Sequence, residues 1–176
     1  MARPKRRTKP SGTYFVTTNT WERRELFRKA PMAEIVEAKL FEYRDKGFYF
    51  VHCYVVMPDH THIILTPGMT TTLEKAVGLI KGGSSFDIGN AFAMKFPVWH
   101  AGFAEHLILD QDDYGGHVRY IDWNPVKAGL VGKPGEYPHC SLNGKYRLDP
   151  WPMASGAKAP SSDEPVAAGL KPRPSD

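Results

Sequence analysis

The chain has 176 residues, 41% of them hydrophobic and 24% charged, which suits one globular domain that buries its own core. No apolar stretch approaches the ~20 residues of a membrane-spanning helix, and the two cysteines have neither CxxC nor zinc-finger spacing. Length and composition therefore exclude a membrane-spanning protein, a disulfide scaffold and a zinc finger. Because the N-terminus also lacks the apolar stretch of a secretory signal, we expect a cytoplasmic protein.

Basic residues are concentrated at the N-terminal end. The first ten residues contain no acid and five basic side chains: Arg3, Lys5, Arg6, Arg7 and Lys9. The formal net charge of the whole chain is only +4, so the remainder is slightly negative. Such an arm can follow a phosphate backbone and release its counterions, which predicts affinity for nucleic acid. A solubilising tail is the alternative.

Three segments with clear periodicity follow. Residues 12–20 are dense in β-branched and aromatic side chains, which predicts a strand. Residues 31–46 repeat apolar side chains at helical spacing, with Pro31 in the first turn and Gly47 after the last, and predict a helix. Residues 48–57 are apolar on both faces and predict a central strand of a sheet.

Two histidines lie on the next predicted strand. Pro58 and Asp59 break the chain, so residues 60–66 should form a hairpin with the preceding strand. Alternate side chains of a strand share a face, so His60 and His62 project together, with roughly 6 to 7 Å between their bases. Two neutral imidazoles on one rigid strand suit one metal ion. However, His-x-His also occurs on solvated strand faces, and two ligands do not complete a site.

The chain then alternates once more between helix and strand. A capping box at residues 71–74 (Thr-Thr-Leu-Glu) begins a helix, and residues 81–85, rich in glycine and serine, interrupt it. That interruption is either a turn whose amides approach phosphate or a plain helix end. Residues 99–109 predict a fourth strand.

A last helix is predicted from the acidic residues 110–113 to Asn124, where Pro125 ends it. Asn124 is then the N-cap of a second short turn that stops at Gly129.

The predicted order is strand, helix, strand, strand, helix, strand, helix. It predicts an α+β fold: a ferredoxin-like, split βαβ antiparallel sheet with an added C-terminal helix. We divide the chain into a basic arm (1–10), this domain (11–146) and a Pro-, Ala- and Ser-rich tail (147–176) that we expect to be disordered.

Three segments together resemble a known family. They are the MPDHTH segment at 57–62, the segment from Trp99 to Asp110, and the YIDWNPVKAGLV segment at 120–131. The set resembles the REP-associated tyrosine transposases, relatives of the single-tyrosine HUH transposases of simple insertion sequences, over roughly residues 10–146. Thr61 replaces the large apolar residue usual between the histidines, and as a β-branched residue it still suits a strand.

The resemblance implies a chemistry. In that family the histidine pair holds a divalent cation, Mg²⁺ or Mn²⁺, which here implies His60 and His62 as ligands. It implies Tyr120 as the nucleophile that attacks single-stranded DNA and forms a 5′-phosphotyrosine. A phenol with a pKa of ~10 is a poor nucleophile at neutral pH, and a cation on the phosphate makes that phosphate more electrophilic. The implied substrate is a hairpin-forming repeat palindrome, and the implied protein is a nucleoid-associated monomer or homodimer.

Two residues near Tyr120 keep alternative roles. Asn124 lies one helical turn after Tyr120 and is either the third metal ligand or an N-cap. Lys127 is either a phosphate contact or ordinary surface.

Three other functions compete with the transposase. The first is a non-catalytic DNA-hairpin-binding or regulatory protein, in which Tyr120 would only pack against the sheet. A zinc hydrolase would require HExxH, and a zinc deaminase PCxxC; neither motif is present.

Overall fold

An antiparallel sheet organises residues 12–94 and 97–152, which are those that the computed structural model describes. Its strands are β1 (Tyr14–Asn19), β2 (Tyr49–Met57), β3 (His60–Pro67) and β4 (Ala104–Leu107), in the order β2-β3-β1-β4. Every pair is antiparallel. The five basic arm residues, Arg3, Lys5, Arg6, Arg7 and Lys9, lie outside the described residues, as does the tail beyond residue 152.

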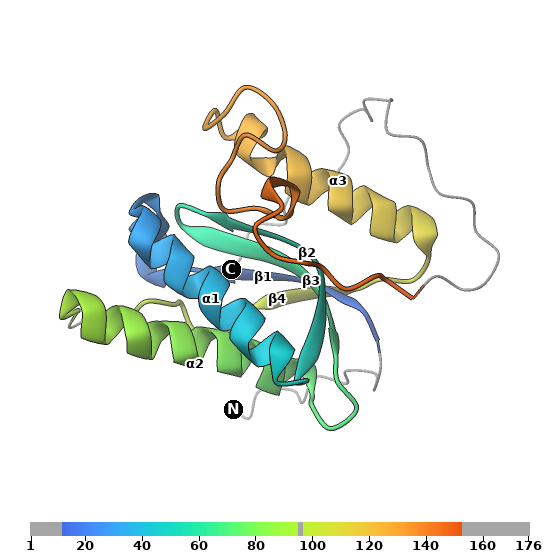
Figure 1. The fold of residues 1–176 in the computed structure, drawn as a ribbon, viewed down its shortest axis with the longest axis horizontal. Coiled ribbons are helices and arrows are strands. Elements are labelled where there is room, and N and C mark those ends of the chain that lie inside the picture. The colour runs from blue at the N-terminus through green and yellow to red at the C-terminus, as the bar shows by residue number, and fades with distance from the viewer. Residues whose placement is uncertain (1–11, 95–96, 153–176) are drawn as a thin grey trace.

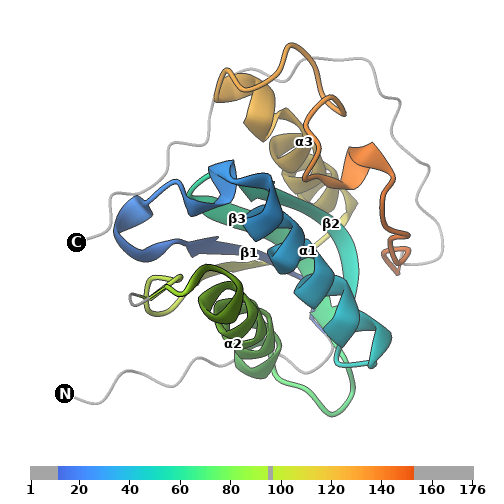
Figure 2. The ribbon, with the colours of Figure 1, turned by 60° about the vertical axis from the view of Figure 1, so that its left-hand side comes forward.

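Helices cover both faces of this sheet. On one face lie α1 (Ala30–Asp45) and α2 (Leu73–Phe92), and on the other lies α3 (Gln111–Lys127) (Figure 1). Figure 2 shows the sheet between these two groups of helices from another side. The element order confirms the predicted α+β, ferredoxin-like arrangement with an added helix. Within the described residues no helix is both long and apolar enough to cross a bilayer.

Strand alternation divides the core into two clusters. On β1, Tyr14, Val16 and Thr18 are buried, and the first two belong to the larger cluster with α1 and α2. Phe15 alternates with them and packs on the smaller cluster under α3. The odd-numbered positions of β1 therefore belong to the α3 side of the sheet.

The helix α2 continues through the segment predicted to interrupt it. Residues 81–85 are helical, and α2 ends only at Phe92. A Cβ on Gly83 would lie 2.8 Å from the Tyr43 hydroxyl, so glycine allows the close approach of α1. Ser84 donates to the Ile80 carbonyl and accepts from the indole of Trp99. The small residues serve helix packing, and the prediction of a turn that binds phosphate is wrong.

The fourth strand is shorter than the predicted span of 99–109. Trp99 makes only an isolated bridge to Thr20, and β4 begins at Ala104. Gly102, with φ of 76°, lies between them in the left-handed region, which a regular strand does not contain.

The last helix passes through Asn124 and Pro125 and ends at Lys127. The predicted break is therefore wrong. Proline removes one backbone donor, but here it lies in the last turn, where little of the helix depends on that bond. The predicted acidic start is confirmed, because the Asp110 side chain accepts from the Asp113 N–H as an N-cap.

The packed chain extends beyond Tyr146. Asp149 pairs with Arg44 and accepts from the Val51 N–H, while Trp151 stacks on Tyr114 of α3. Residues 147–152, which the sequence divides off with the tail, are therefore attached to the sheet and to α3.

Candidate functional site

His60 and His62 lie together on the α3 side of β3. Their ring centroids are 4.7 Å apart. The register pairs His62 with Thr17 and His60 with Asn19 on β1, so both imidazoles share the face of β1 that carries Phe15. The predicted placement of the two side chains on one face is thus found.

Each imidazole is held by its Nδ1 atom. His60 Nδ1 lies 2.6 Å from Asp59 Oδ1, and because an ionised carboxylate only accepts, His60 donates there. His62 Nδ1 lies 2.8 Å from the Thr17 hydroxyl. Asp59 in turn pairs with Arg23, at 3.0 Å. The Nε2 atoms of both rings are therefore the ones left to accept or to ligate.

Burial keeps both rings neutral. Desolvation lowers the pKa of His60, although the bond to Asp59 raises it in part. The pKa of His62 lies well below its ordinary value. Burial is the main cause, and a proton on neighbouring His60 would disfavour the protonated form of His62 further. Neutral imidazole is the form that binds a cation.

Two side chains of α3 complete the cluster. The ring of Tyr120 lies 5.1 Å from the ring of His62, nearly edge-on. The Asn124 side chain lies close enough to His60 to raise the pKa of that ring slightly. Because the helix is unbroken, residues 120 and 124 share one face, and Asn124 is not an N-cap.

This arrangement fits a divalent cation. His62 Nε2 is buried and has no hydrogen-bond partner among the described residues, which is costly unless the atom has another role. Two imidazole nitrogens and the amide oxygen of Asn124 are donors of the kinds that Mn²⁺ and related ions accept. The three side chains therefore have the chemistry to hold such an ion.

The surroundings of the cluster include a cation and several aromatic rings. The ammonium of Lys127, an exposed residue, lies 5.6 Å from the Tyr120 ring centroid, so that charge is next to the cluster. Trp123 on α3 is 47% exposed. Trp99 is buried in the core and Trp21 stacks on His100, so neither presents a free face as Trp123 does.

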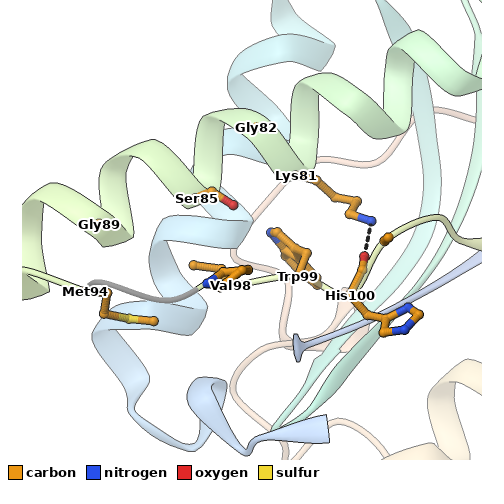
Figure 3. Close-up of a pocket in the computed structure, with 10 residues that line it drawn as sticks. Lys81, Gly82, Ser85, Gly89, Met94, Val98, Trp99 and His100 are labelled. Atoms are coloured by element: carbon orange, nitrogen blue, oxygen red, sulfur yellow. Dashed lines mark hydrogen bonds between the residues drawn. The ribbon is translucent and has the colours of Figure 1, made fainter. Parts of the chain in front are cut away.

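Apart from this cluster, a hollow lies between α2 and residues 97–101. It has a volume of about 330 Å³ and is lined by Gly82, Ser85, Met94 and Trp99 (Figure 3). Lys81 borders it and donates to the carbonyls of His100 and Gly102, so its ammonium holds the loop in place.

Sequence reasoning missed several residues in the cluster and beside it. Thr17 anchors His62 from a position 45 residues away, which only the strand pairing reveals. Phe15 packs on His62 at 5.2 Å and on His117 at 4.6 Å. His117 and Asp113 lie four residues apart on α3, a spacing that does point to one helix face.

Comparisons with known proteins show the family of this chain. The model of the family described as transposase IS200 like matches residues 9–108, which include both histidines but not α3. A REP-associated tyrosine transposase of Escherichia coli K12 is 31% identical over 144 residues, which are 78% of this chain and 84% of the relative.

Two solved structures share the fold. One is a REP-associated tyrosine transposase bound to a REP hairpin, with a TM-score of 0.69 and 24% identity, over 92% of this chain and all of that one. The other, a protein of Deinococcus radiodurans assigned as a transposase, has a TM-score of 0.50 and 18% identity, over 68% of this chain and 95% of the other. With the family match over more than half of its length, the chain belongs to the IS200-like transposases and, among them, to the REP-associated tyrosine transposases.

Proposed function

We propose that this protein cleaves and rejoins single-stranded DNA at hairpin-forming repeats, with Tyr120 as the nucleophile and a divalent cation as cofactor. The observation that carries the proposal is the convergence of Tyr120 on His62, whose buried Nε2 has no partner within the described part of the chain. Family membership supports a DNA-transposing enzyme, and the solved relative that is bound to a REP hairpin supports the substrate.

The proposed reaction follows from the residue types. The Tyr120 oxygen attacks the phosphorus, the new O–P bond forms, and the bond to the 3′ oxygen breaks. The phenol loses its proton and the leaving 3′ oxygen takes one up. The covalent 5′-phosphotyrosine keeps the energy of the phosphodiester, so a 3′ hydroxyl can reverse the attack and rejoin strands without ATP.

His60, His62 and Asn124 would hold the cation, Mg²⁺ or Mn²⁺. Bound there, it would polarise the scissile phosphate and neutralise the charge that develops on its oxygens. Asp59 and Thr17 orient the two rings through Nδ1, which leaves each Nε2 directed away from its anchor.

DNA contacts are proposed for the basic and aromatic residues around the cluster. Lys127 would neutralise a phosphate beside Tyr120, and the arm residues Arg3, Lys5, Arg6, Arg7 and Lys9 would follow the backbone. The exposed ring of Trp123 would stack on an unpaired base.

Replacing Tyr120 tests the proposal. With Mn²⁺ and a labelled single-stranded repeat hairpin, the wild type should form a covalent protein–DNA adduct that survives denaturing electrophoresis. Tyr120→Phe keeps the ring packing on His62 but lacks the nucleophilic oxygen, so its adduct should fall below ~0.1% of the wild-type level.

Tyr114→Phe, which changes another tyrosine of α3, is the matched control and should retain the adduct. An equal adduct from Tyr120→Phe, or none from the wild type, would reject the assignment. If the wild type still forms the adduct when EDTA is present from the start, the cation has no part in the reaction, and His60, His62 and Asn124 are not its ligands. Hairpin binding without any adduct would favour the non-catalytic regulatory protein.

A further inference from the structure

Three side chains beside the proposed catalytic cluster converge on one point and have no role in the reaction above. Asp113 and His117 lie one turn apart on α3, and His106 faces them from β4. One potential ligand atom of each lies within 4.8 Å of those of the other two. They therefore form a compact group of two imidazoles and one carboxylate.

The distances within the group are close to those of a coordination sphere. His106 Nε2 lies 3.0 and 2.9 Å from the two Asp113 carboxylate oxygens. His117 Nδ1 lies 3.0 Å from Asp113 Oδ1 and 2.9 Å from the Asp113 carbonyl oxygen, and the two rings stack at 4.7 Å. An ion with ligand bonds of ~2.1 Å places neighbouring ligands roughly 3.0 Å apart in an octahedral site and roughly 3.4 Å apart in a tetrahedral one. The contacts of both imidazoles with the Asp113 carboxylate are close to this range.

A cation can take the place of the hydrogen bonds within the group. Because an ionised carboxylate only accepts, the imidazole nitrogens that face it carry their protons when no cation is bound. Each neutral imidazole can carry its proton on the other ring nitrogen instead, so a cation bound between the three side chains would gain one carboxylate and two neutral imidazoles as ligands.

The group is separate from the His60 and His62 cluster. The Phe15 ring stands between them, 4.6 Å from His117 and 5.2 Å from His62. Since His106 is exposed on β4, an ion can reach this group from solvent without passing the other cluster.

The local sequence of α3 suggests what such an ion would do. Gly115 and Gly116 lie between Asp113 and His117, and glycine weakens a helix interior. Gly116 has no steric reason to be glycine, since a Cβ there would meet none of the described atoms within 4 Å. An ion held by Asp113 and His117 would bridge this weak turn, and His106 would tie it to the sheet.

We propose that His106, Asp113 and His117 form a second metal site, which binds a transition-metal ion such as Zn²⁺ and fixes the first turns of α3 to β4. Two imidazoles and one carboxylate favour Zn²⁺, Co²⁺ or Mn²⁺ over Mg²⁺ and Ca²⁺, which prefer oxygen alone. The ion itself touches no DNA. The three residues are positioning residues, because they hold the helix that carries Tyr120.

Metal counting with the full chain tests this site. Equilibrium dialysis against Zn²⁺ should give two ions per wild-type chain and one ion in the His60→Ala/His62→Ala double variant. Adding His106→Gln to the double variant should remove the remaining ion. Asp113→Asn, which keeps an acceptor for the Leu109 N–H but loses the charge, should remove it too.

His100→Gln is the matched control, because His100 is also exposed but lies elsewhere and stacks on Trp21. It should leave the count at two. In the double variant, Zn²⁺ should also slow amide hydrogen exchange in the first turns of α3, and His106→Gln should abolish that slowing. A double variant that binds no Zn²⁺, or whose ion persists after His106→Gln, overturns the proposal. The measurement uses no DNA, so its result does not depend on whether Tyr120 forms an adduct.

Discussion

At the residue scale, burial keeps the imidazoles of His60 and His62 neutral, and each ring is anchored by a different partner. A carboxylate holds His60, and a hydroxyl holds His62. The hydroxyl is the weaker and more easily removed anchor, because hydrogen bonds to charged groups are the stronger ones. Thr17 is therefore the residue at which the orientation of a proposed ligand can be changed without touching the ligand itself.

Thr17→Val should weaken the cation dependence of DNA cleavage. Valine has the shape of threonine but cannot hydrogen-bond to His62 Nδ1, so the ring loses its fixed tautomer. Loss of such an anchor typically costs 10- to 100-fold in metal affinity, and the Mn²⁺ concentration for half-maximal adduct formation should rise by roughly that factor.

Thr17→Ser is the matched control, since it retains the hydroxyl. It should need about the wild-type Mn²⁺ concentration. If Thr17→Val and Thr17→Ser behave alike, the hydroxyl does not orient His62.

The pairing of Thr17 with His62 shows where sequence reasoning stops at this scale. His-x-His on a strand places two imidazoles on one face by periodicity alone, and the rings are indeed adjacent. Thr17 comes from another strand, and its position beside His62 depends on the register of β1 against β3. Register follows from packing and turn geometry across the whole sheet.

At the element scale, the two helices that were predicted to break both continue. In α2, Gly83 and Ser84 make tertiary contacts with Tyr43 and Trp99 that offset their poor helix propensity. In α3, Pro125 falls in the last turn, where it removes little of the helix, and the continuity brings Asn124 beside His60. Tertiary contacts explain the first case, and the position of the proline explains the second.

Replacing a glycine by alanine should change the stability of the protein differently between elements and within a helix. A Cβ on Gly68, just after β3, would lie 2.6 Å from the carbonyl oxygen of Gly47. Backbone atoms cannot move aside as a side chain end can, so Gly68→Ala should lower the free energy of unfolding by about 1 to 3 kcal/mol. Urea denaturation followed by circular dichroism measures the change.

Gly78→Ala is its counterpart within α2. A Cβ at Gly78 would meet none of the described atoms within 4 Å, and the position is exposed. Alanine should therefore raise the free energy of unfolding by roughly 0.5 to 1 kcal/mol through helix propensity. Destabilisation at both positions would contradict this difference in packing between the two glycines.

At the scale of the whole molecule, one chain of hydrogen bonds ties the C-terminal segment to β2, to β3 and to the residue just before β1. The Trp151 indole donates to Thr13, whose hydroxyl lies 2.8 Å from that of Thr66. His52 Nε2 lies 2.8 Å from the Thr66 hydroxyl, and His52 Nδ1 lies 3.0 Å from the Asp149 carbonyl. Since a carbonyl only accepts, Nδ1 donates and Nε2 accepts, so the chain requires neutral His52.

Mild acid should therefore weaken this chain of hydrogen bonds. Burial lowers the pKa of His52, although the bond to the Asp149 carbonyl raises it in part. The unfolded chain, with a histidine pKa of ~6.5, then binds the proton first, and the free energy of unfolding decreases as pH falls from that value through the folded pKa. Urea denaturation in EDTA at pH 8.0 and pH 5.5 should show lower stability at pH 5.5.

Replacing the histidine separates this effect from the rest. His52→Gln cannot be protonated and should lose less stability than the wild type between the two pH values. The remaining pH dependence includes His60 and His62, whose pKa values are also lowered by burial. Asp122 opposes them, because burial raises its pKa to about 6 and the folded chain then binds the proton first. An identical decline in wild type and His52→Gln would exclude His52 as a cause.

The charge of the basic arm should affect how tightly the protein binds DNA. Removing residues 1–10 deletes five cations, so DNA binding should weaken and depend less on salt. For single strands, the slope of log affinity against log salt concentration should become shallower by ~0.7 for each phosphate that the arm neutralises in the complete chain. Fluorescence anisotropy with a labelled hairpin at several NaCl concentrations gives the slope, and an unchanged slope would show that the arm neutralises no phosphate.

The order of the sheet also has a consequence for how the protein avoids aggregation. Strands β2 and β4 are its edges, and β2 is nine residues long and largely apolar, a template on which another chain could add. Residues 139–149 cover that edge: Val56 N–H donates to the His139 carbonyl, Tyr54 N–H to the Ser141 hydroxyl and Asp149 N–H to the Val51 carbonyl. The opposite edge is only four residues long. Loss of the chain from residue 139 onward would therefore remove none of the proposed metal ligands but would uncover the strand most prone to self-association.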